Sequence, residues 1–118
     1  MLITTIPQYV QGLKNVKLVA ITDATADGAI LYTAPSAADF NASVITSILV
    51  SEYSGNADTI TVTVTDSTAT FSLFKVKAVA ANTTIELLTK DLILQSGDVI
   101  RASAATASRL HVVASIQE

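Results

Sequence analysis

The stretch Thr83–Ala104, TTIELLTKDLILQSGDVIRASA, contains three short apolar runs that are separated by turns. Ile85 and Leu87 alternate with polar residues, which is the two-residue period of a strand with one buried face. Before the third run, Gly97 can adopt a positive φ without steric cost, and Asp98 can hydrogen-bond to the nearby backbone. The stretch therefore predicts three strands with a hairpin turn around Gly97, and it contains no catalytic pattern.

The rest of the chain repeats this pattern of short apolar runs and turns. Further runs occupy residues 16–22, 29–34, 44–53, 59–65, 69–80 and 109–118. The whole chain then has about nine strands at a spacing of roughly 10 residues, with no convincing helix. Such a pattern is typical of all-β proteins, and we expect an antiparallel β-sandwich or barrel.

The clearest strand is TITVTVT at residues 59–65. Ile60, Val62 and Val64 fall on one face, and Thr61 and Thr63 fall on the other. An uncharged β-branched strand at a free sheet edge would pair with other chains. We therefore expect this strand to be paired on both sides or buried at a subunit contact, with Thr61 and Thr63 as candidate interface residues.

Two other runs do not alternate cleanly. In residues 44–53, apolar side chains occur at both parities, which favours a strand that is covered on both faces, at least in part. In residues 69–80, the apolar parity switches between Leu73 and Phe74. This switch indicates either a β-bulge, which would re-aim the strand, or a strand that is apolar on both sides.

The composition indicates one domain with an unusually uncharged surface. The chain has 118 residues, of which 50% are hydrophobic and only 14% are charged, against about 25% charged in a typical soluble domain. Because the cores of protein interfaces are depleted in charge, this surface favours burial against other subunits over a free monomer. The net charge of −3 argues against a nucleic-acid or membrane partner, and the absence of Cys excludes disulfides.

The N-terminal segment is expected to differ from the rest. Residues 1–14 are predicted to form an arm or an edge segment, and residues 15–118 a single β-sandwich domain. Ile3 lies in a short apolar run that Pro7 ends, because proline cannot donate to a sheet ladder. Tyr9 follows in a loop-like stretch and is a candidate interface anchor, as is Ile3. The segment has neither the pattern of a signal peptide nor a transmembrane run.

The sequence offers no set of catalytic residues. His111 is the single histidine, so it cannot form a histidine metal site, and it lies on the expected outward face of the last strand as a surface or interface residue. Asp23 and Asp27 precede Gly28, but a calcium loop would need a third acidic position and a closing Glu, so a turn is the preferred interpretation. We therefore expect no enzyme activity, no cofactor and no metal site.

Several motifs together resemble a known class of protein. In chain order they are ILYTAP at 30–35, VITSILV at 44–50, TIEL at 84–87, GDVIRASA at 97–104 and LHVVASI at 110–116. This order resembles small virion proteins of tailed bacteriophages over residues 28–118, whereas the segment before Gly28 has no counterpart.

The resemblance implies a jelly-roll-like β-sandwich on the surface of the virus particle. Within that class it implies a head decoration, or cement, protein at the capsid surface. Such a protein binds the phage major capsid protein and stabilises contacts between neighbouring capsid subunits, often as a homotrimer, with no nucleic-acid or membrane partner.

Two other functions remain open at this level. A tail, neck or fibre component could share the fold, but it would be expected to show fibre-like repeats or attachment to a longer chain. A receptor- or carbohydrate-binding module would need exposed aromatic residues beside Asp or Asn at one end of the sandwich. Asn56 and the neighbouring Tyr53 are the only pair of this kind that the loops supply.

Overall fold

The computed structural model describes residues 13–18, 28–36 and 42–118, and these residues form strands, turns and loops only. None of them belongs to a helix that could cross a membrane. The strands are β1 (Leu13–Leu18), β2 (Ala29–Thr33), β3 (Ala42–Glu52), β4 (Asp58–Thr65), β5 (Thr70–Val79), β6 (Thr84–Glu86), β7 (Leu92–Gln95), β8 (Val99–Ala104) and β9 (Leu110–Gln117).

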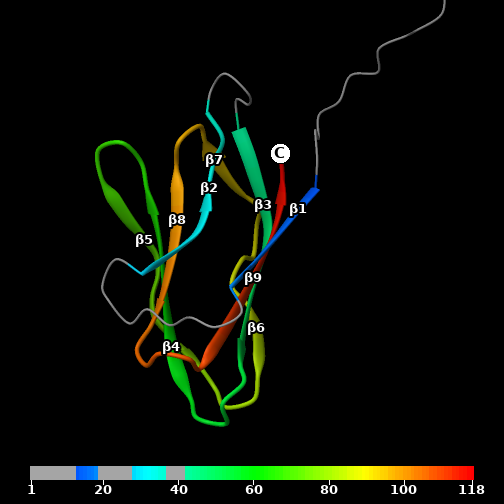
Figure 1. The fold of residues 1–118 in the computed structure, drawn as a ribbon, viewed down its shortest axis with the longest axis vertical. Helices are drawn as coiled ribbons and strands as arrows, with labels where there is room; N and C mark the ends of the chain where they lie inside the picture. The colour runs from blue at the N-terminus through cyan, green and yellow to red at the C-terminus, as the bar shows by residue number, and fades with distance from the viewer. Residues whose placement is uncertain (1–12, 19–27, 37–41) are drawn as a thin grey trace, which may run out of the picture.

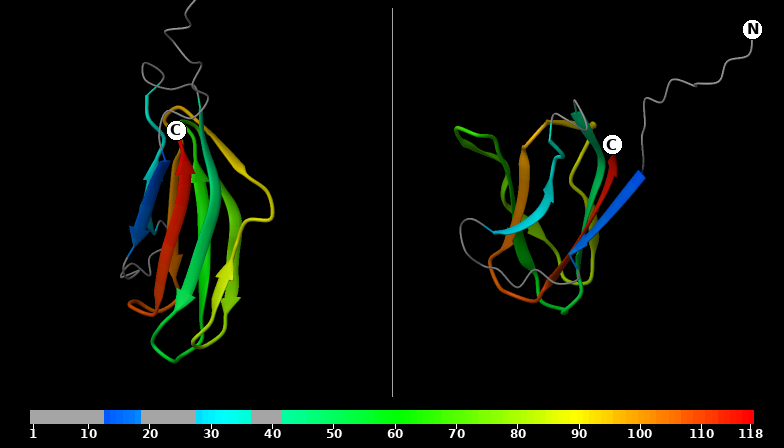
Figure 2. Two further views of the ribbon diagram at one scale, coloured as in Figure 1. Left: turned by 90° about the vertical axis from the view of Figure 1, so that its right-hand side faces the viewer. Right: turned by 45° about the horizontal axis from the view of Figure 1, so that its top comes forward.

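The strands form two antiparallel sheets that face each other in a sandwich-like arrangement (Figure 1). One sheet has the order β1-β9-β3, with β6 and β7 both paired to β3 along its far side (Figure 2). The other sheet has the order β2-β8-β4-β5. Because β6 and β7 pair with different stretches of β3, they share the fourth position of their sheet. The all-β expectation is confirmed.

The pairings are nested along the chain. β1 pairs with β9, β2 with β8, β3 with β6 and β7, and β4 with β5. Within each sheet, β9 also pairs with β3 and β8 also pairs with β4. The chain therefore crosses between the two sheets at most of its connections.

A single apolar core fills the space between the sheets. It includes Ile45, Ile48 and Val50 of β3, Ile60 and Val62 of β4, Ile100 of β8, and Leu110 and Val112 of β9, all fully buried. The expected inward face of TITVTVT is thus confirmed at Ile60 and Val62. β4 is paired on both sides, with β5 and with β8, as expected.

The irregular parity of β3 has a different cause from the one expected. The pairing of β3 with β9 shifts register between Ile45 and Ser47, which indicates a bulge in β3. The bulge brings Ile45 onto the same face as Ile48 and Val50, whereas Leu49 is 40% exposed on the outer face. The expectation of a strand covered on both faces is wrong at Leu49, which is an exposed apolar residue, and the bulge accounts only for the inward position of Ile45.

The parity switch in β5 is a bulge, which was one of the two alternatives left open. The pairing of β4 with β5 shifts register twice, between Ile60 and Val62 and again between Val62 and Thr63. Leu73 lies inside the second shift, since Val62 pairs with Phe74 and Thr63 pairs with Ser72. The extra residues change the face of the sheet to which the following β5 side chains point.

The turn around Gly97 has the expected local chemistry but a different role. Gly97 has a φ of +85°, and the carboxylate of Asp98 accepts the backbone N–H of Gln95 at 2.9 Å. However, β7 and β8 lie in different sheets, so the expected hairpin is wrong and the turn is a crossing between the layers. Turn residues fix a local chain reversal, whereas the apolar faces of the flanking strands decide their partners.

The first described strand begins earlier than expected. β1 spans Leu13–Leu18, where the sequence predicted a loop up to Lys14 and a strand at 16–22. Leu13 and Lys14 join the strand because their backbone pairs with the end of β9, at Gln117 and Ile116. The position of this partner is a tertiary property, so the start of β1 could not be predicted from local pattern.

Candidate interaction site

The outer face of the β2-β8-β4-β5 sheet carries a shallow groove that is lined mainly by threonine and serine residues. The groove has a volume of about 430 Å³, and its lining includes Thr59, Thr61 and Thr63 of β4, Thr70 and Ser72 of β5, and Ser103 of β8. These threonines alternate with the buried residues of β4, so the strand period that builds the core also builds the groove. The predicted interface residues Thr61 and Thr63 lie together here.

The β5 wall of the groove contains a strained residue. Val76 lines the groove, has a φ of +54° and is 60% exposed. A positive φ is a genuine outlier for a β-branched residue. The backbone N–H of Val76 donates a hydrogen bond to Thr61 Oγ1 at 3.0 Å, so the bulge is tied to the threonine face of β4.

We expect Val76→Gly to stabilise the protein by about 1 kcal/mol, because glycine relieves left-handed strain of about 1–3 kcal/mol and loses about 0.5–1 kcal/mol to chain entropy. Thermal or urea unfolding measures the change. The matched control is Ala78→Gly, also exposed on β5, which lacks positive φ and should destabilise. Destabilisation by both substitutions to a similar extent would contradict the strain at Val76.

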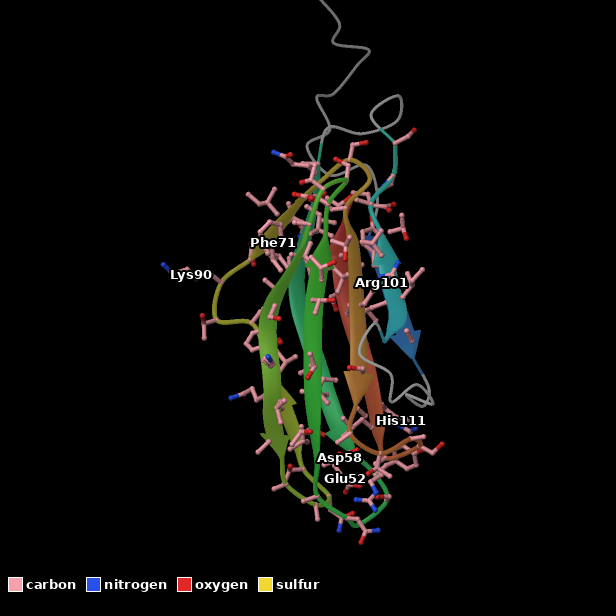
Figure 3. The ribbon with its side chains drawn as sticks, turned by 90° about the vertical axis from the view of Figure 1, so that its left-hand side faces the viewer. Glu52, Asp58, Phe71, Lys90, Arg101 and His111 are labelled. Carbon is pink, nitrogen blue, oxygen red and sulfur yellow. The ribbon has the colours of Figure 1, made fainter. Side chains whose placement is uncertain are left out.

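Two cationic side chains lie on the same face. Lys75 lines the groove, and Arg101 of β8 lies opposite Ile30 of β2 and Thr63 of β4. Figure 3 views this sheet from outside and shows Arg101 at β8, on the side of β2. Among residues 13–18, 28–36 and 42–118, Arg101 Nε is buried without a hydrogen-bond partner, and such a donor costs about 1–3 kcal/mol.

One end of the sandwich is held together by a buried carboxylate. Glu52 at the end of β3 is 3% exposed. It accepts hydrogen bonds from the Ser54 hydroxyl, and from the backbone N–H of Ser54 (2.8 Å), Gly55 (3.1 Å), Asn56 (3.3 Å) and Asn82 (2.8 Å). One side chain therefore joins the β3–β4 turn to the β5–β6 turn.

These bonds also set the acidity of Glu52. Burial alone would raise the pKa of Glu52, but the hydrogen bonds from the Ser54 hydroxyl and from the backbone N–H of Asn82, Ser54 and Gly55 outweigh it and lower the pKa to about 2. The carboxylate is therefore charged at neutral pH and acts as an acceptor for the two turns. Its hydrogen bonds come from both turns, so Glu52 holds these two turns together.

At the opposite end of the sandwich, a tyrosine joins the two sheets. The Tyr32 hydroxyl of β2 bonds to the Ser43 hydroxyl at 3.0 Å and donates to Glu118 Oε1 at 2.5 Å. Burial, followed by the hydrogen bond to Glu118, raises the pKa of Tyr32 to about 12. The hydroxyl is therefore protonated over the whole neutral range and serves as a fixed donor.

We expect Tyr32→Phe to destabilise the protein by about 1–3 kcal/mol, because it leaves the buried Ser43 hydroxyl without this partner. The wild type should also lose stability between about pH 10 and pH 12, since the folded pKa of Tyr32 lies above its unfolded value of 10.0 and the folded state holds the proton more tightly. Alkaline melts of the two proteins test this: equal slopes over this window would contradict the assignment.

His111 lies elsewhere, on the outer face of the other sheet. Its ring stacks on Tyr53 with centroids 4.0 Å apart. The structure therefore separates His111 from Thr61 and Thr63, and the three do not form one site. The stack occupies one face of Tyr53, the aromatic residue that a sugar platform at this end would require. The remaining predicted interface residues, Ile3 and Tyr9, lie outside the described residues, as do Asp23 and Asp27.

A second, apolar groove lies along one flank between the sheets. Its volume is about 250 Å³, and its lining includes Leu73 and Phe74 of β5 with Leu87, Leu88 and Leu92 of the β6–β7 region. Phe71 lies toward this flank (Figure 3) and is 52% exposed. Within the described residues, no three His, Cys, Asp or Glu side chains gather at a metal-binding distance.

The described residues define an all-β, sandwich-like protein with one groove lined by threonine and serine residues and one apolar groove. No family model, curated protein or solved structure matches this chain.

Proposed function

We propose that this protein is a bacteriophage virion structural protein, and that it is a head decoration protein with a jelly-roll fold. It binds the outer surface of the capsid and stabilises contacts between major capsid subunits, as a homotrimer. The motifs at residues 28–118 supply the resemblance to small phage virion proteins, and the strand order supports the fold that this resemblance implies.

The nested pairing of the strands is the observation that carries the proposal. A jelly roll is a long antiparallel hairpin wrapped into two sheets, so its first strand pairs with its last, its second with its second-to-last, and so on inward. With β6 and β7 counted as one interrupted strand, the pairs β1–β9, β2–β8, β3–β6/β7 and β4–β5 follow this order. The jelly roll is a common architecture of viral capsid proteins.

The surface chemistry supports a role in assembly. Several large apolar side chains are exposed, among them Ile93 (66%), Val76 (60%) and Phe71 (52%), in a chain that is only 14% charged. Many copies of such a domain would add contact area across the joints between capsid subunits. The work is mechanical and needs no catalytic residues.

The test is co-sedimentation of the purified protein with empty heads, and separately with tails, of the phage that encodes it. We expect saturable binding to heads, and light scattering after size exclusion should give the mass of a trimer. Binding to tails alone would overturn the proposal in favour of a tail or neck component. Absence of binding to either particle would overturn the virion role.

A further inference from the structure

We propose that the protein docks through the outer face of the β2-β8-β4-β5 sheet, and that the occupant of this face is an acidic protein segment whose carboxylates bind Arg101 and Lys75. This inference rests on the proposed function and deepens it, because it names the docking surface and the chemistry of the partner. It is carried by the arrangement of charge, hydroxyl groups and apolar side chains on this face.

Acidic and basic side chains occupy different parts of the described structure. The chain has ten acidic and seven basic residues, yet the outward positions of β2, β8, β4 and β5 in the described structure carry Arg101 and Lys75 and no carboxylate. Glu52 and Asp58 lie at one end of the sandwich (Figure 3), and Asp66 and Asp98 lie in turns at the ends of strands. A negatively charged protein thus presents one positive sheet face.

Neither cation is neutralised by a carboxylate of the described residues. Within the described residues, Arg101 and Lys75 make no ion pair, and Arg101 Nε lacks an acceptor. Arginine binds carboxylates through two parallel N–H donors, and a carboxylate of the partner would pair with the terminal N–H groups of Arg101, because the buried Nε cannot be reached from outside. Opposite charge on the partner also favours the correct orientation on encounter.

The hydroxyl groups between the cations are suited to the same partner. Thr61 Oγ1 accepts the N–H of Val76, so the hydroxyl keeps its own proton for donation. Thr63 and Ser72 pair across β4 and β5 and make no side-chain hydrogen bond within the described part of the chain. The face therefore offers several neutral donors to carboxylate or backbone carbonyl oxygens.

The spacing of the cations fits an extended segment. Arg101 is on β8 and Lys75 is on β5, with β4 between them. Thr63 of β4 pairs with both Arg101 and Ser72, so Lys75 lies further along β5 and the two backbones are more than two strand spacings, or about 10 Å, apart. Alternate residues of an extended chain are about 7 Å apart, and the long side chains of Arg and Lys can span the difference. Ile30 (52% exposed) and Val76 (60% exposed) add apolar contact on either side.

The surface is tested by titrating the ¹⁵N-labelled protein with a peptide of alternating Glu and Ser, and with a single-stranded oligonucleotide as the competing anion. We expect peptide-induced amide shifts to cluster at Thr61, Thr63 and Ser103. Arg101→Gln and Lys75→Gln should each weaken binding about tenfold, as expected for a paired charge at an interface. The matched control is Lys90→Gln, which removes one positive charge from the exposed β6–β7 connection and should bind as wild type.

Two outcomes would overturn the proposal. Equal weakening by all three variants would mean that binding follows net charge and not this face. Stronger binding of the oligonucleotide at the same amides would replace the acidic segment with nucleic acid. Spectra of the free variants must first show the dispersed peaks of a folded protein, and Arg101→Lys provides a second variant that keeps the charge but loses the bidentate geometry.

The same variants separate this inference from the proposed function. If wild-type protein binds heads and Arg101→Gln binds them about as tightly, the docking face is wrong while the decoration role stands. If wild-type protein binds no heads but binds the acidic peptide on this face, the face stands and the decoration role is wrong. Weakened head binding by Arg101→Gln and Lys75→Gln, with Lys90→Gln unchanged, supports both.

Discussion

Val62→Asp is expected to unfold the protein. Val62 is fully buried in the middle of β4, between β5 and β8, so a carboxylate there would lie in the core without a partner. An unpaired buried charge and the lost apolar contact together cost more than about 4 kcal/mol. This loss is comparable with about 5 kcal/mol, the lower end of the stability of such domains, so the variant should be largely unfolded or should melt far below the wild type. Circular dichroism and thermal melting measure the effect.

The neighbouring residue provides a matched control. Thr63→Asp introduces the same carboxylate one position along β4, on the solvent side, and should change the free energy of unfolding by less than about 1 kcal/mol. The same variant places a negative charge in the proposed docking groove, so it should fold but bind the acidic peptide poorly. A normal melt for Val62→Asp, or unfolding by Thr63→Asp, would mean that the two faces of β4 are assigned the wrong way round.

Glu52→Gln is expected to lower the stability of the protein at neutral pH. The neutral amide replaces a charged acceptor with a weaker one, and its NH₂ group cannot accept the N–H groups that now converge on the second carboxylate oxygen. The β3–β4 turn and the β5–β6 turn would both lose part of their anchor. Urea unfolding at pH 7 measures the loss, and faster amide exchange at Gly55 and Asn82 should locate it.

Glu52→Gln should also change how the stability of the protein depends on pH. The pKa of Glu52 is lowered to about 2 in the folded protein from an ordinary 4.5, so between these values the unfolded state binds more protons than the folded state. The stabilisation is therefore present above about pH 4.5 and is lost as the pH falls toward 2. Glu52→Gln should show a flatter decline over this window.

Some acid sensitivity should remain in that variant. The backbone N–H groups of Thr68 and Ala69, with the Thr68 hydroxyl, lower the pKa of Asp66 in the same direction. Asp91→Asn, at an exposed position in the β6–β7 connection, is the matched control and should leave the decline unchanged. An unaltered acid decline in Glu52→Gln would show that the hydrogen bonds to Glu52 do not set its acidity.

The candidate interaction face could not be predicted from local sequence pattern. The sequence predicted Thr61 and Thr63 as surface residues of one strand, and the structure adds Arg101, Lys75 and Ser103 from neighbouring strands to the same face. No sequence signal joins Arg101 to Thr63, which lie 38 positions apart, because their proximity depends on the pairing of β8 with β4. The anchoring role of Glu52 was also missed, since its partners are backbone groups of turns that the fold brings together.

The amino-acid sequence by itself determined the strand-forming segments and the inner face of the regular ones. Strict alternation in β4 and β9 places Ile60, Val62, Leu110 and Val112 in the core, because side chains of a strand point to alternate sides whatever the partner strand is. The turn at Gly97 was also determined locally, by the residues of the turn itself. These properties depend on each residue and its immediate neighbours.

Only the tertiary structure decided the register, the bulges and the choice of sheet. The bulge in β3 moves Ile45 onto the inner face, and the crossing at Gly97 sends β7 and β8 to opposite layers. Both are set by contacts between segments far apart in the chain, where burying the most apolar area across two sheets outweighs the preference of any one segment. The contact surfaces follow from those pairings, and for that reason they appear only in the folded protein.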